Sequence, residues 1–268
     1  MMEIPDILLR IVEQRRESIA RQESAIRSCL DTEPPTELPP GRGRRFVDRL
    51  SRAQGRAIIA EVKMGSPSLG KLDKQIDPEG IARIYAQNGA AALSVVTEPD
   101  FFFGSYEILT RCQESSGLPV LAKDFIVHPL QIQLARHSGA SACLLIAALH
   151  PGSELRELAD QISESGLVAL IECHTLEDVG KLEGSEWPLV GVNNRSLRTF
   201  KVDLSHSMDL VQALPAGALK VAESGLSSRE DIESLAAAGF SAFLIGESLL
   251  LSDDPGAKLI ELGAVLAS

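Results

Sequence analysis

Lysine and glutamate side chains recur at the ends of short apolar runs in this chain of 268 residues. Glu61 and Lys63 stand two residues apart in the run AIIAEVK, so both side chains point to the same face of an extended strand. Lys123 and Glu172 stand at the ends of two further runs. Side chains that donate and accept protons, gathered in one place, could carry acid–base catalysis on a small anionic substrate.

Further polar residues follow the same placement. Asn193 and Arg195 share a face at the end of another run, and Glu223 and Ser224 end the next one. One such residue is usually a solvated loop residue, and a single Glu–Lys pair can be a structural salt bridge. Burying several charges is costly, however, unless they pair or bind a ligand. Because the placement recurs on five separate runs, the pattern favours a shared active site.

Glycine and serine residues predict where a phosphate binds. Gly225 and Gly246 follow the last two apolar runs, and Glu247 stands next to the second glycine. The corresponding loops of an eight-stranded barrel often hold a phosphate, because glycine lets backbone N–H groups approach the anion. Ser66, in MGSPSLGK (64–71), adds a hydroxyl on a loop that could close over the substrate. Each feature alone is also typical of an ordinary turn.

Three consecutive phenylalanines predict an apolar lining for a substrate ring. Phe101, Phe102 and Phe103 stand together in EPDFFFGS, although aromatic residues make up only 4% of the chain. The alternative is that these side chains cover the edge of the barrel.

Eight apolar runs must position these side chains. They are nearly continuously apolar, as expected of parallel strands buried on both faces, and amphipathic segments lie between them. This alternation gives either a closed barrel or an open doubly wound sheet. The even repeat, the length and the lack of G-x-G-x-x-G after the first run favour an α/β fold of the (β/α)8 TIM-barrel type. The predicted strands are 57–63, 91–97, 118–124, 142–148, 167–173, 188–194, 218–224 and 241–247, and the clearest helices are 77–89, 128–140 and 227–240.

A helical extension precedes the predicted barrel. An apolar stripe runs along the segment 3–30, formed by Leu8, Val12, Ile19 and Ile26. The proline- and glycine-rich segment 31–44 is typical of a linker. We therefore expect a helical extension with its linker over residues 1–46, packed on a catalytic barrel over residues 47–268.

Composition limits the classes of partner. The formal net charge of −11 argues against a nucleic-acid partner, which requires a basic surface, but leaves room for local cations in a cleft. No apolar run reaches the roughly 18 residues that span a bilayer, and the first residues lack the secretory pattern. We therefore expect no membrane association and a cytoplasmic location.

Cysteine and histidine spacing predicts no metal site. None of the four cysteines forms a C-x-x-C pair, and Cys143 and Cys173 are expected to be small buried residues. Glu172 and His174 flank Cys173, but adjacent strand residues point to opposite faces, which disfavours a cluster of all three ligands.

The stretch IIAEVKMGSPSLG resembles the signature of the indole-3-glycerol-phosphate synthase family. So do TEPDFFFGS, PVLAKDFIVHPLQI, GVNNRSLRTFKVDL, VAESGL and FLIGESLL, in the family's order and spacing, so the resemblance covers essentially the whole chain. Met64 and Leu69 depart from the family, which more often has a polar or basic residue and a lysine there. Both stand in the loop after the first run, so they concern loop movement and affinity more than reaction type.

The resemblance implies a reaction of tryptophan biosynthesis that needs no cofactor. The substrate would be 1-(2-carboxyphenylamino)-1-deoxyribulose 5-phosphate, which condenses onto its own carbonyl, loses CO2 and then loses water. By this resemblance Lys123 is the general acid and Glu172 the general base. Lys63 would hold the substrate carboxylate or phosphate, or serve as a second acid, and Glu61 would complete the network.

The same resemblance implies the binding residues and a monomer or weak dimer. Asn193 and Arg195 would orient the substrate and the catalytic carboxylates. The remaining expected contacts are Glu223 and Ser224 in the pocket, Phe101 or Phe102 with Phe125 and Leu144 at the ring, and Ser66, Gly225, Gly246 and Glu247 at the phosphate.

Three alternatives stay open from the sequence. A related isomerase, phosphoribosylanthranilate isomerase, is expected to carry a Cys and an Asp where this chain has Glu61 with Lys63 and Asn193 with Arg195. A Schiff-base aldolase could use Lys123. A non-catalytic binding protein on the same fold should have lost the strand-end charges, which this chain retains.

Overall fold

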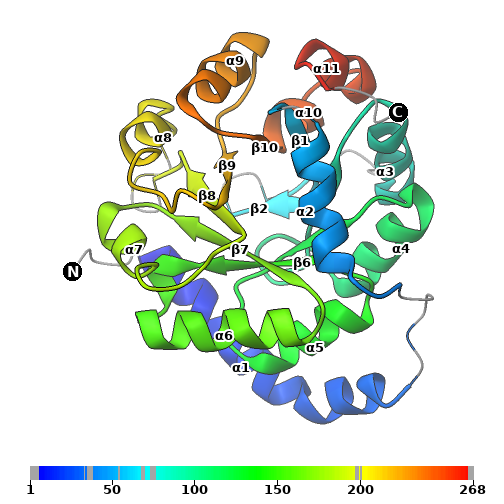
Figure 1. Ribbon diagram of the computed structural model, residues 1–268. Helices are drawn as coiled ribbons and strands as arrows, with labels where there is room; N and C mark the ends of the chain where they lie inside the picture. Colours follow the sequence, from blue (N-terminus) through cyan, green and yellow to red (C-terminus); the bar gives the residue numbers. More distant parts are fainter. Residues whose placement is uncertain are drawn as a thin grey trace.

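A closed barrel of parallel strands forms the body of the protein. The computed structural model describes residues 6–32, 34, 39–53, 55–67, 70–72, 77–196, 199 and 201–264. The barrel strands follow the order β1-β10-β9-β8-β7-β6-β5-β4, with helices around them (Figure 1). They are β1 (Ala57–Val62), β4 (Ala92–Val96), β5 (Val120–Lys123), β6 (Ala142–Ile146), β7 (Val168–Cys173), β8 (Leu189–Asn193), β9 (Leu219–Glu223) and β10 (Ala242–Ile245). This confirms the predicted fold class, and each strand lies within one predicted run.

Helices alternate with these strands along the chain. They are α1 (Asp6–Leu30), α2 (Arg42–Arg52), α3 (Pro78–Gln87), α4 (Tyr106–Ser116), α5 (Pro129–His137), α6 (Gly152–Glu164), α7 (Leu176–Gly180), α8 (Ser205–Leu210), α9 (Arg229–Ala238), α10 (Glu247–Leu250) and α11 (Pro255–Glu261), with a 3-10 turn at Ala147–Leu149. A small antiparallel pair, β2 (Gly65–Ser66) and β3 (Gly70–Lys71), stands in the loop after β1. No helix among the described residues has the length and apolar character needed to cross a membrane.

Side-chain alternation divides the core into two layers. Ile58 and Ala60 of β1 face outward and pack among residues of the surrounding helices. Ile59, between them, faces inward and packs with Leu170 and Leu244 from other strands. Strands buried on both faces in this way explain why the runs are almost continuously apolar.

Two of the helices begin at side chains that cap their first backbone N–H groups. Asp77 accepts a hydrogen bond from the backbone N–H of Glu79, and Pro78 occupies the first position of α3. At α9, Ser228 and Asp231 form the reciprocal capping box.

Helix α1 confirms the predicted N-terminal helix and packs on the outside of the barrel. Its Ile19 and Ile26 side chains bury against Leu130 of α5. Figure 1 shows α1 next to α5, whereas α2, which follows α1 in the sequence, lies on another side of the barrel.

Helix α2 begins inside the segment expected to be a linker, which is therefore shorter than predicted. It starts at Arg42, directly after Gly41, and ends at Arg52. Phe46 and Leu50 are fully buried and close the end of the barrel where the strands begin. The boundary expected between residues 46 and 47 thus falls inside α2.

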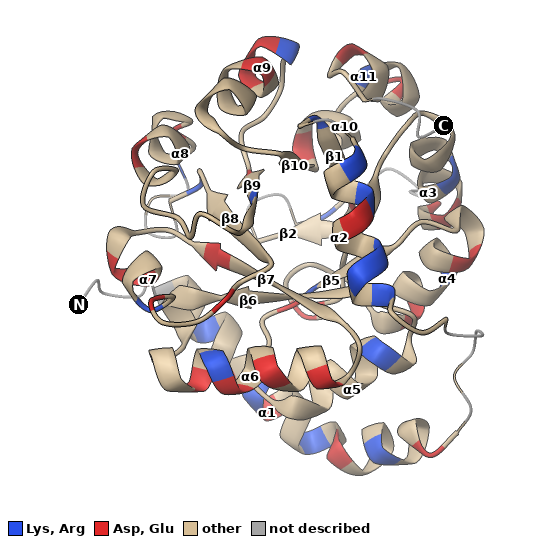
Figure 2. Ribbon diagram, viewed as in Figure 1, with Lys and Arg blue, Asp and Glu red and all other residues tan. Residues whose placement is uncertain are grey.

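Basic residues gather on α2, as Figure 2 shows. Arg42 donates hydrogen bonds to the backbone carbonyls of Arg136 and Ala140, and Arg49 donates to that of Ala91. These arginines satisfy carbonyl groups in the last turn of α5 and just before β6 and β4, so they hold α2 in place rather than form a catalytic site.

Candidate active site

A cavity of about 950 Å³ opens at the ends of the barrel strands, on the side opposite α2. Active sites of this fold lie at that end. The predicted site residues that line it are Glu61, Lys63, Ser66, Phe102, Lys123, Phe125, Leu144, Glu172, Asn193, Arg195, Ser224, Gly225, Gly246 and Glu247. The residues predicted from the sequence therefore make up half of those that line the cavity.

Two lysines share one carboxylate in this cavity. Lys123 Nζ lies 2.7 Å from Glu61 Oε2, and Lys63 Nζ lies 3.0 Å from Glu61 Oε1. Burial alone would raise the pKa of Glu61, but the charges of Lys123 and Lys63 lower it to about 2. Burial alone would lower the pKa of Lys123 as well. The charges of Glu61, Glu223 and Glu172 nevertheless raise it above its ordinary value. Glu61 therefore holds two ammonium groups toward the cavity.

A second carboxylate is oriented by an amide. Asn193 Nδ2 donates to Glu172 Oε2 at 3.0 Å, while Asn193 Oδ1 accepts from the backbone N–H of Arg195 at 3.0 Å. His174 Nε2 lies 3.5 Å from Glu172 Oε1, and burial lowers the pKa of that histidine. A carboxylate fixed on one oxygen by Asn193 can accept a proton from a substrate carbon at the other.

Glu223, which the sequence placed in the pocket, is not among the residues that line the cavity. It is fully buried, next to Glu172. Burial and the charge of Glu172 raise the pKa of Glu223 well above its ordinary value, which favours the protonated form of this side chain. Both glutamates stand at strand ends, so residue type and position in the sequence do not distinguish their environments.

Two glycines make room for the polar groups. A Cβ at Gly246 would stand 2.3 Å from Glu61 Oε1, so only glycine lets that carboxylate reach both lysines. Gly225 has φ +82° and Ser224 before it φ +67°, both in the left-handed region that side chains disfavour. The turn after β9 thus directs its backbone toward the cavity.

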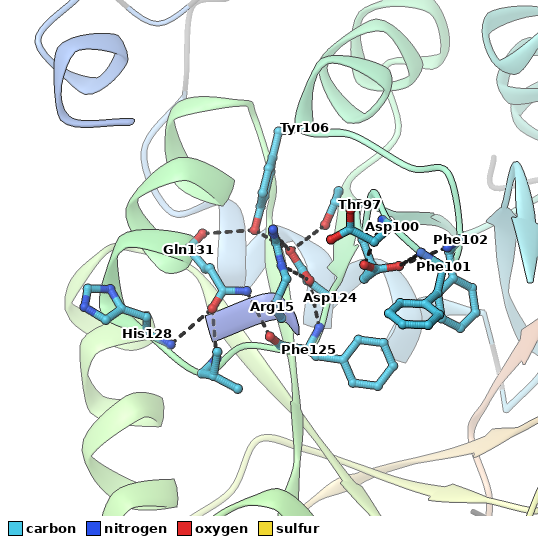
Figure 3. Close-up of polar contacts among 12 residues, drawn as sticks. Arg15, Thr97, Asp100, Phe101, Phe102, Tyr106, Asp124, Phe125, His128 and Gln131 are labelled. Atoms are coloured by element: carbon cyan, nitrogen blue, oxygen red, sulfur yellow. Dashed lines mark hydrogen bonds and ion pairs between the residues drawn. The ribbon is translucent and has the colours of Figure 1, made fainter. Parts of the chain in front are cut away.

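The aromatic loop is held by a glutamate that the sequence did not single out. Glu98 Oε2 accepts from the backbone N–H groups of Phe101 and Phe102 at 2.8 and 2.9 Å (Figure 3). Phe102 lines the cavity, whereas Phe101 does not, so of the two expected ring contacts only Phe102 is in place. Phe103 is exposed and packs against Gly65 in the loop after β1.

Helix α1 supplies part of the cavity wall. Ile7, Leu8 and Ile11 line it, together with Asp124 after β5. The apolar stripe that included Leu8 predicted the helix but not its position over the mouth, because the segment that follows α1 carries no pattern that fixes its course.

Other predicted features take ordinary structural places. Cys112, Cys143 and Cys173 are buried, and burial raises the pKa of each thiol. Among the residues that the structure describes, no three His, Cys, Asp or Glu side chains gather as metal ligands. Met64 lies in the described loop after β1, whereas Leu69 lies outside the described residues.

Solved structures share the barrel fold. The 3-hexulose-6-phosphate synthase of Salmonella typhimurium matches with a TM-score of 0.62 and 13% identity, covering 78% of this chain and 98% of that one. A mutant tryptophan synthase alpha-subunit of Pyrococcus furiosus matches with a TM-score of 0.59 and 16% identity, covering 80% and 99%. Identities this low support the fold alone.

Sequence comparison is more specific. The profile of a family described as indole-3-glycerol phosphate synthase matches residues 8–262. An indole-3-glycerol phosphate synthase of Carboxydothermus hydrogenoformans is 41% identical over 259 residues, which cover 94% of this chain and 97% of that one. One of Koribacter versatilis is 43% identical over 254 residues, covering 94% and 96%. These findings mean that the chain belongs to the indole-3-glycerol phosphate synthase family.

Proposed function

We propose that the chain is a carboxy-lyase of tryptophan biosynthesis. It converts 1-(2-carboxyphenylamino)-1-deoxyribulose 5-phosphate to indole-3-glycerol phosphate, with loss of CO2 and water. Family membership supports this reaction. The observation that carries it is the pair of ammonium groups, Lys63 and Lys123, that Glu61 holds in the same cavity as the oriented carboxylate Glu172.

The cavity offers a separate region for each part of this substrate. The substrate ring packs against the aromatic pair of Phe102 and Phe125, whose ring centroids lie 6.0 Å apart, with Leu144 completing the apolar side. The phosphate binds at the turns after β9 and β10, where Gly225 and Gly246 expose the backbone. In the barrel order β9 stands opposite β5, so the two ends of an extended substrate lie on opposite walls.

Lys123 starts the reaction as the general acid. It donates a proton to the ketone oxygen while the ring carbon that bears the carboxylate attacks the ketone carbon, so a C–C bond forms and the oxygen becomes a hydroxyl. The bond to CO2 then breaks and its electron pair restores the aromatic ring. Lys63 holds the carboxylate until that step.

Dehydration completes the indole. The hydroxyl leaves as water with a proton from Lys123 or Lys63, and Glu172 takes a proton from the neighbouring carbon, which forms the new double bond. The sequence of steps consumes one proton overall, as decarboxylation of a carboxylate requires.

The ion pair with Glu61 favours this role for Lys123 over a Schiff base. A raised pKa keeps the amine as an ammonium group, which is the form that donates a proton. Schiff-base formation requires the neutral amine, so the aldolase alternative is disfavoured.

Turnover of the named substrate, followed by indole fluorescence, tests the proposal in the wild type, in Lys123→Ala and in Lys258→Ala. Lys258 pairs with Glu261 on α11, away from the cavity, so its variant should match the wild type. Lys123→Ala should lose on the order of a hundred- to ten-thousand-fold in turnover. Robust product from Lys123→Ala would transfer the acid role to Lys63. No product from folded wild type would refute the proposed reaction.

We propose further that the enzyme acts in the cytoplasm, as a monomer or weak dimer without nucleic acid. The net charge of −11 supports the last point, because nucleic-acid binding requires a basic surface. Analytical ultracentrifugation over a range of protein concentrations would measure the oligomeric state.

A further inference from the structure

One arginine of α1 points into the barrel mouth instead of toward solvent. Arg15 Nε donates to Asp124 Oδ1 at 2.9 Å and Arg15 Nη2 donates to Asp124 Oδ2 at 2.5 Å. The Arg15 side chain is 4% exposed and that of Asp124 is fully buried. Burial alone would lower the pKa of Arg15, but the charge and hydrogen bonds of Asp124 raise it above its ordinary value, so the pair is ionised.

Asp124 joins four separate parts of the fold. Besides Arg15, its carboxylate accepts from Thr97 Oγ1 at 3.2 Å, from the Tyr106 hydroxyl at 2.9 Å and from the backbone N–H of Phe125 at 2.9 Å (Figure 3). Thr97 follows β4 and Tyr106 begins α4. The position of α1 is therefore tied to the ends of β4 and β5, where the substrate ring is expected.

Asp124 also stands between two residues of the cavity wall, Lys123 and Phe125. Both backbone polar groups of Phe125 are fixed, the N–H by Asp124 and the carbonyl by Gln131 Nε2 at 2.9 Å. This leaves little freedom for the peptide that directs the Phe125 ring toward Phe102.

The same helix face reaches the cavity one turn earlier. Ile11 lines the cavity and stands four residues before Arg15, which places the two side chains on one face of α1. Fixing Arg15 on Asp124 therefore also fixes Ile11 over the cavity.

We propose that Arg15 is a positioning residue for the cyclisation. Through Asp124 it holds Ile11, Phe102 and Phe125, named here the aryl wall, in register with the acid Lys123. Arg15 itself does not line the cavity, so it acts on the substrate only through these residues. The inference deepens the proposed function and rests on it.

Loss of the Arg15–Asp124 pair should therefore affect substrate binding more than the chemical steps. A loosened aryl wall weakens binding of the ring in the ground state and in the transition state alike, whereas Lys123 stays on Glu61. KM should therefore rise more than kcat falls.

The test compares three variants in steady-state turnover and thermal unfolding. Arg15→Met removes the charge and keeps a long apolar stem, and Arg15→Lys keeps the charge but not the paired hydrogen bonds. Ile26→Ala is the matched control, because it loosens α1 against α5 at a distance from the pair.

Arg15→Met should raise KM by about tenfold or more with kcat within about threefold of the wild type. Arg15→Lys should have a KM between those of the wild type and Arg15→Met. If Arg15→Met does not fold, the KM of Arg15→Lys is compared with that of the wild type instead. Ile26→Ala should lower the unfolding temperature and leave KM unchanged.

The inference is overturned if a folded Arg15 variant keeps the wild-type KM, or if Ile26→Ala raises KM as much at a similar loss of stability. An equal rise in the inhibition constant of inorganic phosphate in Arg15→Met would overturn it too, because the phosphate region lies on the opposite wall. In each case the wild type still turns over, whereas an inactive wild type refutes the proposed function itself.

Discussion

Glu61 links the charge of the active site to the stability of the fold. Its pKa is about 2 in the folded protein, against an ordinary value of 4.5, because Lys123 and Lys63 outweigh burial. A folded-state pKa below the unfolded value stabilises the fold above pH 4.5, and this contribution is lost as the pH falls from 4.5 toward 2.

Glu61→Gln should therefore lower the free energy of unfolding near neutral pH by on the order of 3 kcal/mol. The difference from the wild type should shrink as the pH falls below the ordinary glutamate pKa. Urea unfolding of both proteins between neutral pH and about pH 3 would measure it. A difference that stays constant with pH would contradict the assigned ion pairs.

Glu223 should show the opposite dependence. Its pKa is raised in the folded protein, so the unfolded state loses its proton first as the pH rises. The wild type should lose stability as the pH rises above the ordinary glutamate pKa toward the raised value. Glu223→Gln mimics the neutral acid and should remove this slope while leaving stability in mild acid nearly unchanged. Denaturant unfolding in mild acid and in mild base would measure how the free energy of unfolding depends on pH in both proteins. The same pH dependence in Glu223→Gln as in the wild type would contradict the raised pKa of Glu223.

At the scale of elements, the turn after β9 depends on a glycine. A Cβ at Gly225 would meet Val202 Cγ1 at 2.1 Å on a backbone with φ +82°. Gly225→Ala should displace this turn, raise KM for the phosphorylated substrate about tenfold and cost about 1–3 kcal/mol of stability. Gly217 has open space around its Cα and lies in the loop before β9, so Gly217→Ala is the matched control. If Gly225→Ala and Gly217→Ala have the same KM, the turn after β9 does not bind the phosphate.

At the scale of the whole molecule, α2 covers one end of the barrel and the active-site cavity lies at the other end. Phe46 of α2 is fully buried among Ala57, Leu189 and Ala242, at the end remote from the cavity. Phe46→Ala should destabilise the fold by about 3–5 kcal/mol through the cavity it leaves. KM and kcat at moderate temperature should stay near wild type, because the catalytic groups lie at the other end. Urea unfolding and steady-state kinetics on one preparation would test both, and a loss of turnover without a loss of stability would contradict this division.

The barrel, its eight strands and half of the residues that line the cavity follow from patterns in the sequence. Buried parallel strands require nearly continuous apolar runs, and a barrel of such strands brings all their ends to one mouth. The alternation of side chains along a strand then predicted, from the sequence, that Glu61 and Lys63 share one face of their strand. Local rules of this kind act over a few residues and can be read along the chain.

Contacts between residues far apart in the sequence follow from the folded structure alone. Arg15 and Asp124 are 109 positions apart, and no local pattern pairs them. The folded structure also separated Glu223 from Glu172, because a pKa depends on burial and neighbouring charges rather than on residue type. Helix α2 was missed for a related reason: its Phe46 and Leu50 are helical because the open end of the barrel offers them a place to be buried.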